Sequence, residues 1–499
     1  MTTFAPSPQR AAVWLLVTVG LASVATSQAA ELSVPPGFEV EVVAGPPLVE
    51  HPLMACFDER GRLFVAEAAG VNLPSEALLE QKPNSIRLLE DSDGDGRFDR
   101  GQVFADQMTF PQGALWRDGA LYVCSPPNLW KLEDTDGDGR CDRRTPLVGK
   151  FGFNGNAADI HGPFAGPDGW LYWCDGRHGH DIDQPDGAKT EGLAARIFRC
   201  RPDGSGLETV CGGGMDNPTE LAFTAAGEPL ATVNILLSRP QRVDAIVYGI
   251  EGGVYPYHEC YREFRRTGEL LPAVGPLGWV AVSGIVRYRG QALGDDLQGN
   301  FFTAQFNPHR VQRHVVEREQ AGFRIRHEDF LTSTNHDFHP TDVLEDADGS
   351  LLVIDTGGWF RNGCPTSQIA KPEVTGAIYR VRRTGVERPT DPRGTKIAWS
   401  ELNAAGLAAL LDDPRPAVRD RAIAVAAARG DERAGVAGKS RGGEFGRTTP
   451  QRGLGAMPHR RSESSRSRAS GGSPMPISTC GWQPCTRRAC TATQRPPMP

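Results

Sequence analysis

The chain has 499 residues, of which 58 are Gly and 39 are Pro, a share above the ordinary one that predicts many turns. With 39% hydrophobic residues and 9 Trp, it can form a large core, which excludes a collagen-like or wholly disordered protein. The formal net charge of -7 argues against a nucleic-acid partner, because neutralising phosphates requires an excess of Lys and Arg.

The first 30 residues have the pattern of an export signal. Arg10 precedes an apolar run over residues 11–24, and small residues ending in Ala29 and Ala30 follow it. A membrane span takes about 20 apolar residues, so we expect a cleaved signal peptide over residues 1–30, with an uncleaved anchor as the alternative. No later stretch reaches membrane length, which predicts an exported protein, periplasmic or at the cell surface, with no membrane span after cleavage.

One phrase recurs six times between residues 35 and 383: an apolar stretch, a turn rich in Asp or Gly, and an alternating strand. Its copies lie at residues 56–65, 115–123, 166–173, 221–230, 285–302 and 344–353. Because Asp-Gly turns tolerate positive φ and the flanking residues alternate, each copy predicts a β-hairpin. Six hairpins at this spacing predict an all-β fold, a six-bladed β-propeller over residues 35–383, with a large β-sandwich as the alternative.

The composition changes after Arg383. A linker at residues 388–394 leads to apolar positions at 402–411 and to a helical pattern at residues 416–428, so we expect a short α-helical segment over residues 398–434 that resembles one HEAT-type repeat. Residues 435–499 hold eleven basic and two acidic residues without periodicity, which predicts a disordered tail. Its abrupt onset indicates a frame-shifted or truncated reading of a longer gene.

Two segments share the pattern DxDGDGxxD. The acidic positions are Asp91, Asp93, Asp95 and Asp99 in the first segment, and Asp134, Asp136, Asp138 and Asp142 in the second. Carboxylates at alternate positions of a tight loop converge on one point, which is the oxygen-rich arrangement that Ca²⁺ prefers. Gln102 and Thr145 stand where an EF-hand has its bidentate Glu, so these are not EF-hands. The alternative is that the loops are simple hairpin turns.

Two further patterns lie in the third and fourth copies of the phrase. Asp159 and His161 precede an expected inner strand, where an imidazole can face the central channel and act as a general base, although a histidine packed for structural reasons is the alternative. The next copy begins with Asp216 and Asn217. The histidines of residues 178–181 indicate an exposed polar loop, with a metal site as the alternative. No CxxC or CxxCH pattern occurs, so no zinc ribbon or c-type haem is encoded here.

Taken together, these segments resemble the soluble quinoprotein glucose/sorbosone dehydrogenase superfamily. The resemblance is carried by His161 with residues 166–172 and by residues 216–223. The chain resembles more closely the N-terminal propeller of membrane-bound dehydrogenases of planctomycete-type bacteria. The segments that carry this second resemblance are the two aspartate hairpins and residues 306–311, 337–343 and 355–359.

The resemblance implies an oxidoreductase that oxidises a sugar or alcohol hydroxyl with pyrroloquinoline quinone and Ca²⁺, and that passes electrons to a c-type cytochrome. It assigns catalytic roles to His161, Asn217 and Asp159, and cofactor binding to Asp216, Arg310, His339 and Thr341. Asp216, His339 and Thr341 stand where the superfamily has arginines, and a tricarboxylate quinone requires cations. Arg177, Arg196 or Arg310 could replace them if the channel places them suitably. The alternative is a non-catalytic, calcium-stabilised propeller that binds a glycan or a protein.

Overall fold

The computed structural model describes residues 32–429, apart from 156–157, 185–186, 238–240, 258 and 360–369. These residues belong to one compact unit, Met1–Lys439. The predicted export signal (1–30) and the predicted tail (435–499) lie outside the described residues. Within the described part of the chain, no helix is long and apolar enough to span a membrane.

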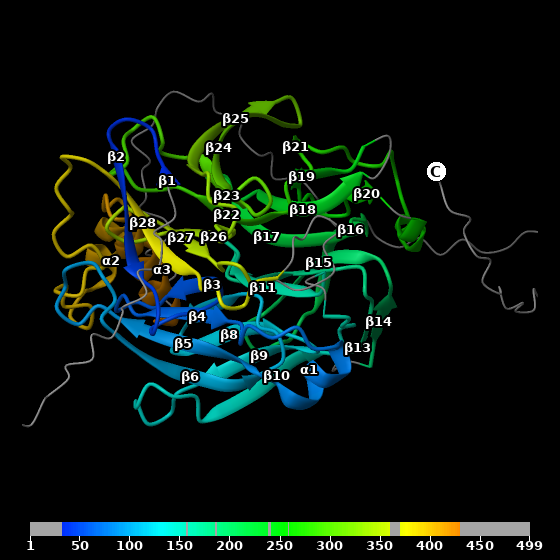
Figure 1. Cartoon of the computed structure of the whole chain (residues 1–499), viewed down its shortest axis with the longest axis horizontal. Coiled ribbons are helices and arrows are strands. Elements are labelled where there is room, and N and C mark those ends of the chain that lie inside the picture. Colours follow the sequence, from blue (N-terminus) through cyan, green and yellow to red (C-terminus); the bar gives the residue numbers. More distant parts are fainter. Residues whose placement is uncertain are drawn as a thin grey trace, which may run out of the picture. The chain divides into compact units, whose positions relative to one another are not determined.

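Six sheets of four or five strands follow one another around a centre (Figure 1). Blade 1 contains β3 (Pro52–Phe57), β4 (Leu63–Glu67), β5 (Asn84–Glu90) and β6 (Arg100–Met108), and blade 2 contains β7 (Ala114–Arg117), β8 (Ala120–Ser125), β9 (Asn128–Glu133) and β10 (Arg143–Gly149). Blade 3 contains β11 (Ile160–Ala165), β12 (Leu171–Asp175), β15 (Ala195–Cys200), β16 (Glu208–Gly214) and β20 (Val254–Pro256). Blade 4 contains β17 (Asn217–Phe223), β18 (Pro229–Leu237), β19 (Val243–Tyr248) and β21 (Gly275–Gly278).

The last two blades include strands from the beginning of the described chain. Blade 5 contains β22 (Val282–Arg287), β23 (Phe301–Gln305), β24 (Arg310–Glu319), β25 (Gly322–Ser333) and β1 (Leu32–Ser33). Blade 6 contains β26 (Pro340–Glu345), β27 (Leu351–Asp355), β28 (Ala377–Arg383) and β2 (Phe38–Ala44). A separate hairpin, β13 (His180–Asp183) with β14 (Lys189–Gly192), extends from blade 3.

The ring of blades is closed. The innermost strands β3, β7, β11, β17, β22 and β26 each contact the next, and β26 also contacts β3. Blade 6 is completed by β2, which pairs with β28 so that Val40 lies opposite Val381. This radial closure confirms the predicted six-bladed propeller, because a sandwich has no such ring of contacts.

The repeated phrase of the sequence forms the first two strands of each blade. In blade 3, for example, Gly169 adopts a φ of 83° in the turn between β11 and β12, a conformation that glycine adopts without a steric penalty. Apolar side chains then pack within and between blades, as where Trp173 stacks on Phe198 at 5.5 Å. Cys56, Cys124, Cys141, Cys174, Cys200 and Cys211 are free thiols.

The antiparallel order of the strands gives the propeller two distinct ends. All six innermost strands begin at one end, which we call the entry face, and they finish at the opposite end, the exit face. Segments that precede an innermost strand therefore lie at the entry face. The turns that join the first strand of a blade to its second lie at the exit face, as do the turns from third to fourth strand.

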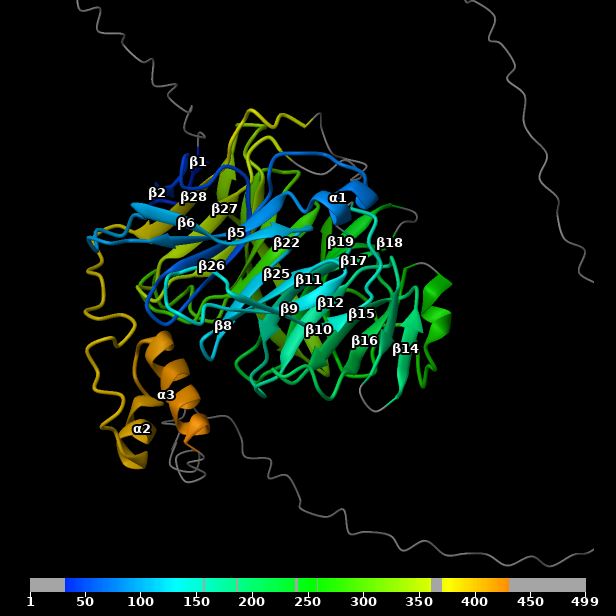
Figure 2. The ribbon, with the colours of Figure 1, turned by 90° about the horizontal axis from the view of Figure 1, so that it is seen from below.

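Helices are few among the described residues. Besides α1 (Ser75–Gln81) and a short 3-10 turn (Glu259–Glu263), the chain forms α2 (Ala404–Leu410) and α3 (Pro416–Ala428) after the last blade (Figure 2). The helices α2 and α3 pack on each other through Leu407 and Val418, and an ion pair of 2.8 Å joins Asp420 to Arg289 of the propeller. The helical segment is present as expected, while its likeness to a HEAT repeat stays a prediction.

Candidate functional site

Four residues predicted to belong to the site lie at the entry face. Asp159 immediately precedes β11, and His161 is the second residue of that strand. Asn217 is the first residue of β17, and His339 immediately precedes β26. All four side chains are buried, with exposed fractions of 8% or less. The fold thus brings them to the same end of the propeller, with His339 two blades along from Asn217.

The corner between blades 3 and 4 has the densest set of predicted residues. The backbone N–H of Gly176 donates to the carbonyl of Asp159 at 2.9 Å, and the N–H of Arg177 donates to the carbonyl of Asp216 at 3.1 Å. These bonds hold the segment after β12 between the beginnings of β11 and β17. The corner therefore presents His161, Arg177 and Asn217 on one continuous piece of structure.

Asp216 is engaged by an arginine that comes from the neighbouring blade. Its carboxylate accepts a hydrogen bond from Nε of Arg177, and the two side chains form an ion pair. The Arg177 side chain keeps 38% of its surface exposed, against 11% for Asp216. Of the three arginines considered as replacements for the missing superfamily arginines, Arg177 is the one that lies beside Asn217.

The other two arginines have different partners. Arg196 forms an ion pair with Glu263 and lies over the ring of Phe264, 4.7 Å from its centroid. Arg310, predicted to bind a cofactor, forms an ion pair of 2.9 Å with Asp329 and donates from Nε to Gln305. The guanidinium of Arg310 thus has its partners, Asp329 and Gln305, within blade 5.

His339 is fixed in its orientation at the start of blade 6. Its Nδ1 bonds to the carbonyl of Gly357 at 2.6 Å, and its ring stacks on Phe306 with the centroids 4.3 Å apart. Burial lowers the pKa of His339 to about 4, so the imidazole is neutral near pH 7. Thr341, the other predicted cofactor contact of this blade, bonds to the carbonyl of Ile354 at 3.4 Å.

A set of residues that the sequence analysis missed organises the loops of the entry face. In every blade the second strand carries a polar residue at or near its end: Glu67, Ser125, Asp175, Asn234, Gln305 and Asp355. Asp355, for example, accepts the N–H groups of His339 and Gly357, both at 2.8 Å, and burial raises its pKa to about 7. An alternation scan could have found these positions, because each interrupts an apolar strand at the same place in the repeat.

Asp175 and His180 form a buried pair in blade 3. Asp175 Oδ2 lies 2.8 Å from His180 Nδ1, and the His180 side chain has no exposed surface. Burial raises the pKa of Asp175 to about 6, although the contact with His180 opposes that shift. The expected exposed polar loop at residues 178–181 is therefore wrong for His180, whose ring packs against Phe198.

Several buried polar atoms at the entry face lack a hydrogen-bond partner. Within the described residues these atoms include His180 Nε2, Asn234 Oδ1, Thr356 Oγ1 and Trp359 Nε1. Each belongs to a segment at the entry-face end of its blade. Buried polar groups in proteins are nearly always paired, so ordered water or a polar ligand is needed to complete these four atoms. Other such atoms, among them Nε of Arg380 and of Arg382 near the exit face, lie elsewhere in the propeller.

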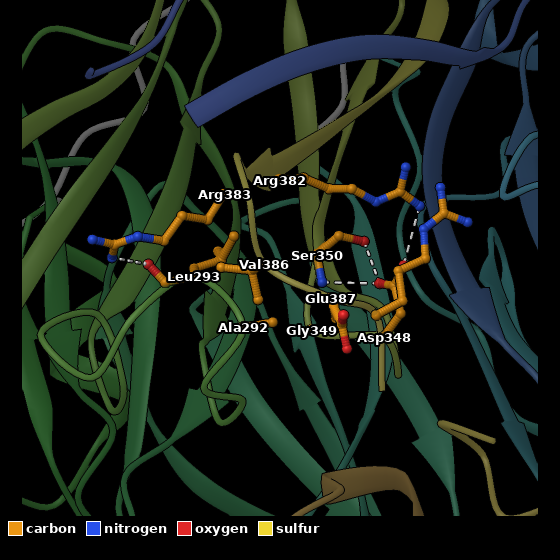
Figure 3. A pocket seen from close by; sticks show the side chains of 10 residues that line it. Ala292, Leu293, Asp348, Gly349, Ser350, Arg382, Arg383, Val386 and Glu387 are labelled. Carbon is orange, nitrogen blue, oxygen red and sulfur yellow. Dashed lines mark hydrogen bonds and ion pairs between the residues drawn. The ribbon is translucent and has the colours of Figure 1, made fainter. Parts of the chain in front are cut away.

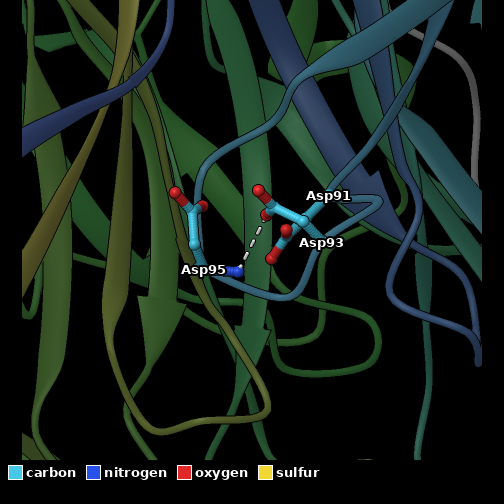
Figure 4. Close-up of side chains that lie close together, drawn as sticks. All are labelled: Asp91, Asp93 and Asp95. Atoms are coloured by element: carbon cyan, nitrogen blue, oxygen red, sulfur yellow. Dashed lines mark hydrogen bonds between the residues drawn. The ribbon is translucent and has the colours of Figure 1, made fainter.

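The predicted metal-binding aspartates lie at the exit face, in the turns between β5 and β6 and between β9 and β10. Carboxylate oxygens of Asp91, Asp93 and Asp95 lie within 4.8 Å of one another, as do those of Asp134, Asp136 and Asp138. In the first loop, Asp93 Oδ1 accepts the N–H of Asp95 at 3.1 Å (Figure 4). A cation bound in these loops therefore lies at the opposite end from His161.

The fourth aspartate of each loop does not join the other three. Asp99 accepts a hydrogen bond from the Ser92 hydroxyl at 2.6 Å, and Asp142 accepts one from the Thr135 hydroxyl at 2.9 Å. These contacts lower the pKa of both carboxyls. Asp99 and Asp142 thus close the loop ends in the structure, while three oxygens per loop converge.

A small pocket at the exit face contains none of the predicted site residues (Figure 3). Two of its arginines have partners within the pocket, because Arg382 contacts Asp348 at 3.1 Å and Arg383 donates to the carbonyl of Leu293 at 2.9 Å. The predicted catalytic and cofactor-binding residues lie at the entry face, which is the candidate site.

The fold defines the class of protein, a six-bladed β-propeller. Residues 25–384 match a family described as a domain of unknown function, DUF7133, and the chain belongs to this family. No curated protein matches the chain.

Solved structures similar to the chain include an oxidoreductase (glucose dehydrogenase) from Thermus thermophilus, at 18% identity and a TM-score of 0.49, covering 69% of this chain and 100% of that one. The pyranose dehydrogenase PQQ domain from Coprinopsis cinerea matches at 14% identity and a TM-score of 0.47, covering 72% and 98%. The PQQ-bound aldose sugar dehydrogenase from Streptomyces coelicolor matches at 15% identity and 0.46, covering 70% and 99%. The function below is argued from the chain's own residues.

Proposed function

We propose that the entry face binds a sugar or a related polyol at the corner of blades 3 and 4. The observation that carries this proposal is that two buried polar atoms of blades 3 and 4, His180 Nε2 and Asn234 Oδ1, lack a hydrogen-bond partner within the described residues. A ligand with many hydroxyl groups can donate and accept at such atoms, and water can serve the remainder. The buried side chains of Asp159, His161 and Asn217 supply further polar groups at the same corner.

The chemistry proposed for this corner is oxidation of a bound hydroxyl, in an exported protein. His161 would accept the hydroxyl proton, since a neutral imidazole is the common general base near pH 7. Asp159, two residues before it, and Asn217 on the adjacent strand would orient the ring and the substrate. The hydride of the same carbon would pass to a separate two-electron acceptor, which would then reduce a c-type cytochrome in two one-electron steps.

The entry face does not fit pyrroloquinoline quinone. Three carboxylates require several cationic partners, whereas Arg177 is paired with Asp216, and Lys371 donates to Asp337 at 2.7 Å. The other arginines at this end, Arg196 and Arg310, are paired with Glu263 and Asp329. The buried acids Asp159, Asp175 and Asp355 also lie here. We therefore derive no step through the quinone, and a non-catalytic propeller that binds a glycan is the second candidate.

Calcium belongs to the proposal as a stabilising cation at the exit face. Three converging carboxylates in each loop repel one another unless a cation neutralises them, and all-oxygen donor sets suit Ca²⁺. The described residues hold two such groups, one on blade 1 and one on blade 2. At that end the ions would stabilise turns and would not contact a ligand at the entry face.

One experiment tests the proposal and separates its two forms. Purified protein is titrated by calorimetry with a panel of monosaccharides and disaccharides, and is then mixed with Ca²⁺ and a dye that accepts two electrons. Sugar binding with dye reduction that the substitution His161→Asn abolishes supports the dehydrogenase. Sugar binding without dye reduction supports the glycan-binding propeller, and absence of binding by any sugar contradicts the proposal.

A further inference from the structure

The guanidinium of Arg177 is held at one nitrogen and open at the others. Asp216 engages its Nε, and the backbone bond of 3.1 Å from Arg177 N to the Asp216 carbonyl fixes the chain beside it. Within the described residues, no hydrogen bond or ion pair of Nη1 or Nη2 is found, and 38% of the side chain is exposed. The group is therefore anchored through Nε, and its two terminal NH₂ groups remain as donors.

This arrangement suits a carboxylate. The two Nη atoms of an arginine present parallel N–H donors that match the two oxygens of one carboxylate. Because Asp216 fixes the guanidinium beforehand, binding an anion there costs little additional ordering of the side chain. A point charge on a flexible stem, such as a lysine, would not provide this fork.

The groups around Arg177 are suited to neutral hydroxyls more than to further anions. Burial, together with the charge of Arg177, lowers the pKa of His178, so its ring is neutral near pH 7. Asn217 and His161 are buried at 7% and 6% exposure. Asp159 and Asp175, which also lie at the entry-face end of blade 3, are buried and disfavour a second negative charge. The corner thus offers one place for a carboxylate and several for hydroxyls.

We propose that Arg177, positioned by Asp216, binds the carboxylate of a sugar acid at the corner of blades 3 and 4. The ligand class is a uronate or aldonate, either free or as a residue of an acidic polysaccharide. This inference rests on the proposed function, because it assumes that the entry face binds sugars. It makes Arg177 the residue that decides between acidic and neutral sugars.

The test compares ligands that differ in one charge. Glucuronate and its methyl ester are titrated by calorimetry into the full chain and into Arg177→Gln and Arg177→Lys. The wild-type protein is expected to bind glucuronate at least about tenfold more tightly than the ester. Arg177→Gln should remove this preference, so that acid and ester bind with equal affinity, and Arg177→Lys should retain only part of it. The substitution Arg100→Gln, at an exposed arginine of the exit face, is the matched control.

Asp216→Asn tests the positioning role, because it keeps the arginine and removes its anchor. It should weaken glucuronate binding more than ester binding, with an unaltered melting temperature showing that the fold is intact. Oligogalacturonates in a further titration separate the two sources: tighter binding than glucuronate indicates a polysaccharide, and equal binding indicates a free sugar acid. Equal affinities for acid and ester in the wild-type protein would overturn the inference and leave the proposed function standing, whereas absence of binding by every sugar would overturn both.

Discussion

The carboxyl groups of Glu220 in blade 4 and Asp342 in blade 6 share a hydrogen bond. Each also accepts a backbone N–H from the next blade along, Glu220 from Ile285 at 3.0 Å and Asp342 from Ala55 at 3.0 Å. The pair therefore links four consecutive blades through their innermost strands. Gly284 lies between the two side chains, where an added Cβ would approach Asp342 Oδ1 to 2.6 Å.

The shared proton predicts a pH-dependent stability. Burial raises the pKa of Glu220 well above its ordinary value and that of Asp342 to about 6. Because both values are higher in the folded state, the contribution to stability is full below about pH 4 and is lost as the pH rises through about 6 and beyond. We expect the free energy of unfolding to fall by up to about 1.4 kcal/mol per pH unit for each proton involved.

Glu220→Gln isolates this effect, since the amide keeps an oxygen for Ile285 and an N–H for Asp342. Urea unfolding measured from pH 5 to pH 8 should show a flatter profile for this variant than for the wild type. Glu319→Gln, at an exposed glutamate, is the control and should follow the wild type. If the free energy of unfolding changed with pH in the same way for the wild type, Glu220→Gln and Glu319→Gln, this result would contradict a proton shared by Glu220 and Asp342.

Removal of calcium should destabilise the propeller. A ligand that binds only the folded state raises the melting temperature by mass action, so EDTA should lower that of the wild-type protein. The double substitution of Asp93 and Asp136 by Ala should abolish the response, and Asp295→Asn, in another exposed turn, should retain it. A melting temperature that EDTA leaves unchanged would reduce the two loops to turns.

Asp355→Ala should loosen the entry face. The substitution leaves the N–H groups of His339 and Gly357 without their acceptor, and each unsatisfied buried donor costs about 1–3 kcal/mol. We expect the free energy of unfolding to fall by about 2 kcal/mol or more. Asp355→Asn keeps an acceptor oxygen, so its free energy of unfolding should fall less than that of Asp355→Ala. Equal decreases in the two variants would argue against Asp355 as the acceptor for these N–H groups.

The fold was predictable from the sequence because its repeat is local. The turn and the strand alternation of each hairpin lie within about ten residues, as at Gly169, and six copies define the ring. The placement of Asp159, His161, Asn217 and His339 at one end followed from their position before the innermost strands. Sequence spacing was sufficient for these features.

Contacts between blades were not predictable in the same way. Arg177 and Asp216 are 39 positions apart, and Glu220 and Asp342 are brought together only by closure of the ring. The partners of Arg310 and the burial of His180 likewise depend on which side of a strand faces a neighbouring blade. Such pairings depend on tertiary packing, which a local pattern does not specify.

Hydrogen–deuterium exchange with and without a bound sugar tests the central claim most directly, because it locates the ligand without assuming a reaction. With glucuronate present, the account predicts slower exchange in the segments around residues 176–179 and 215–218, and unchanged exchange in the exit-face loops 91–99 and 134–142. Protection confined to the exit face, or no protection by any sugar in the panel, would contradict a ligand site at the corner of blades 3 and 4.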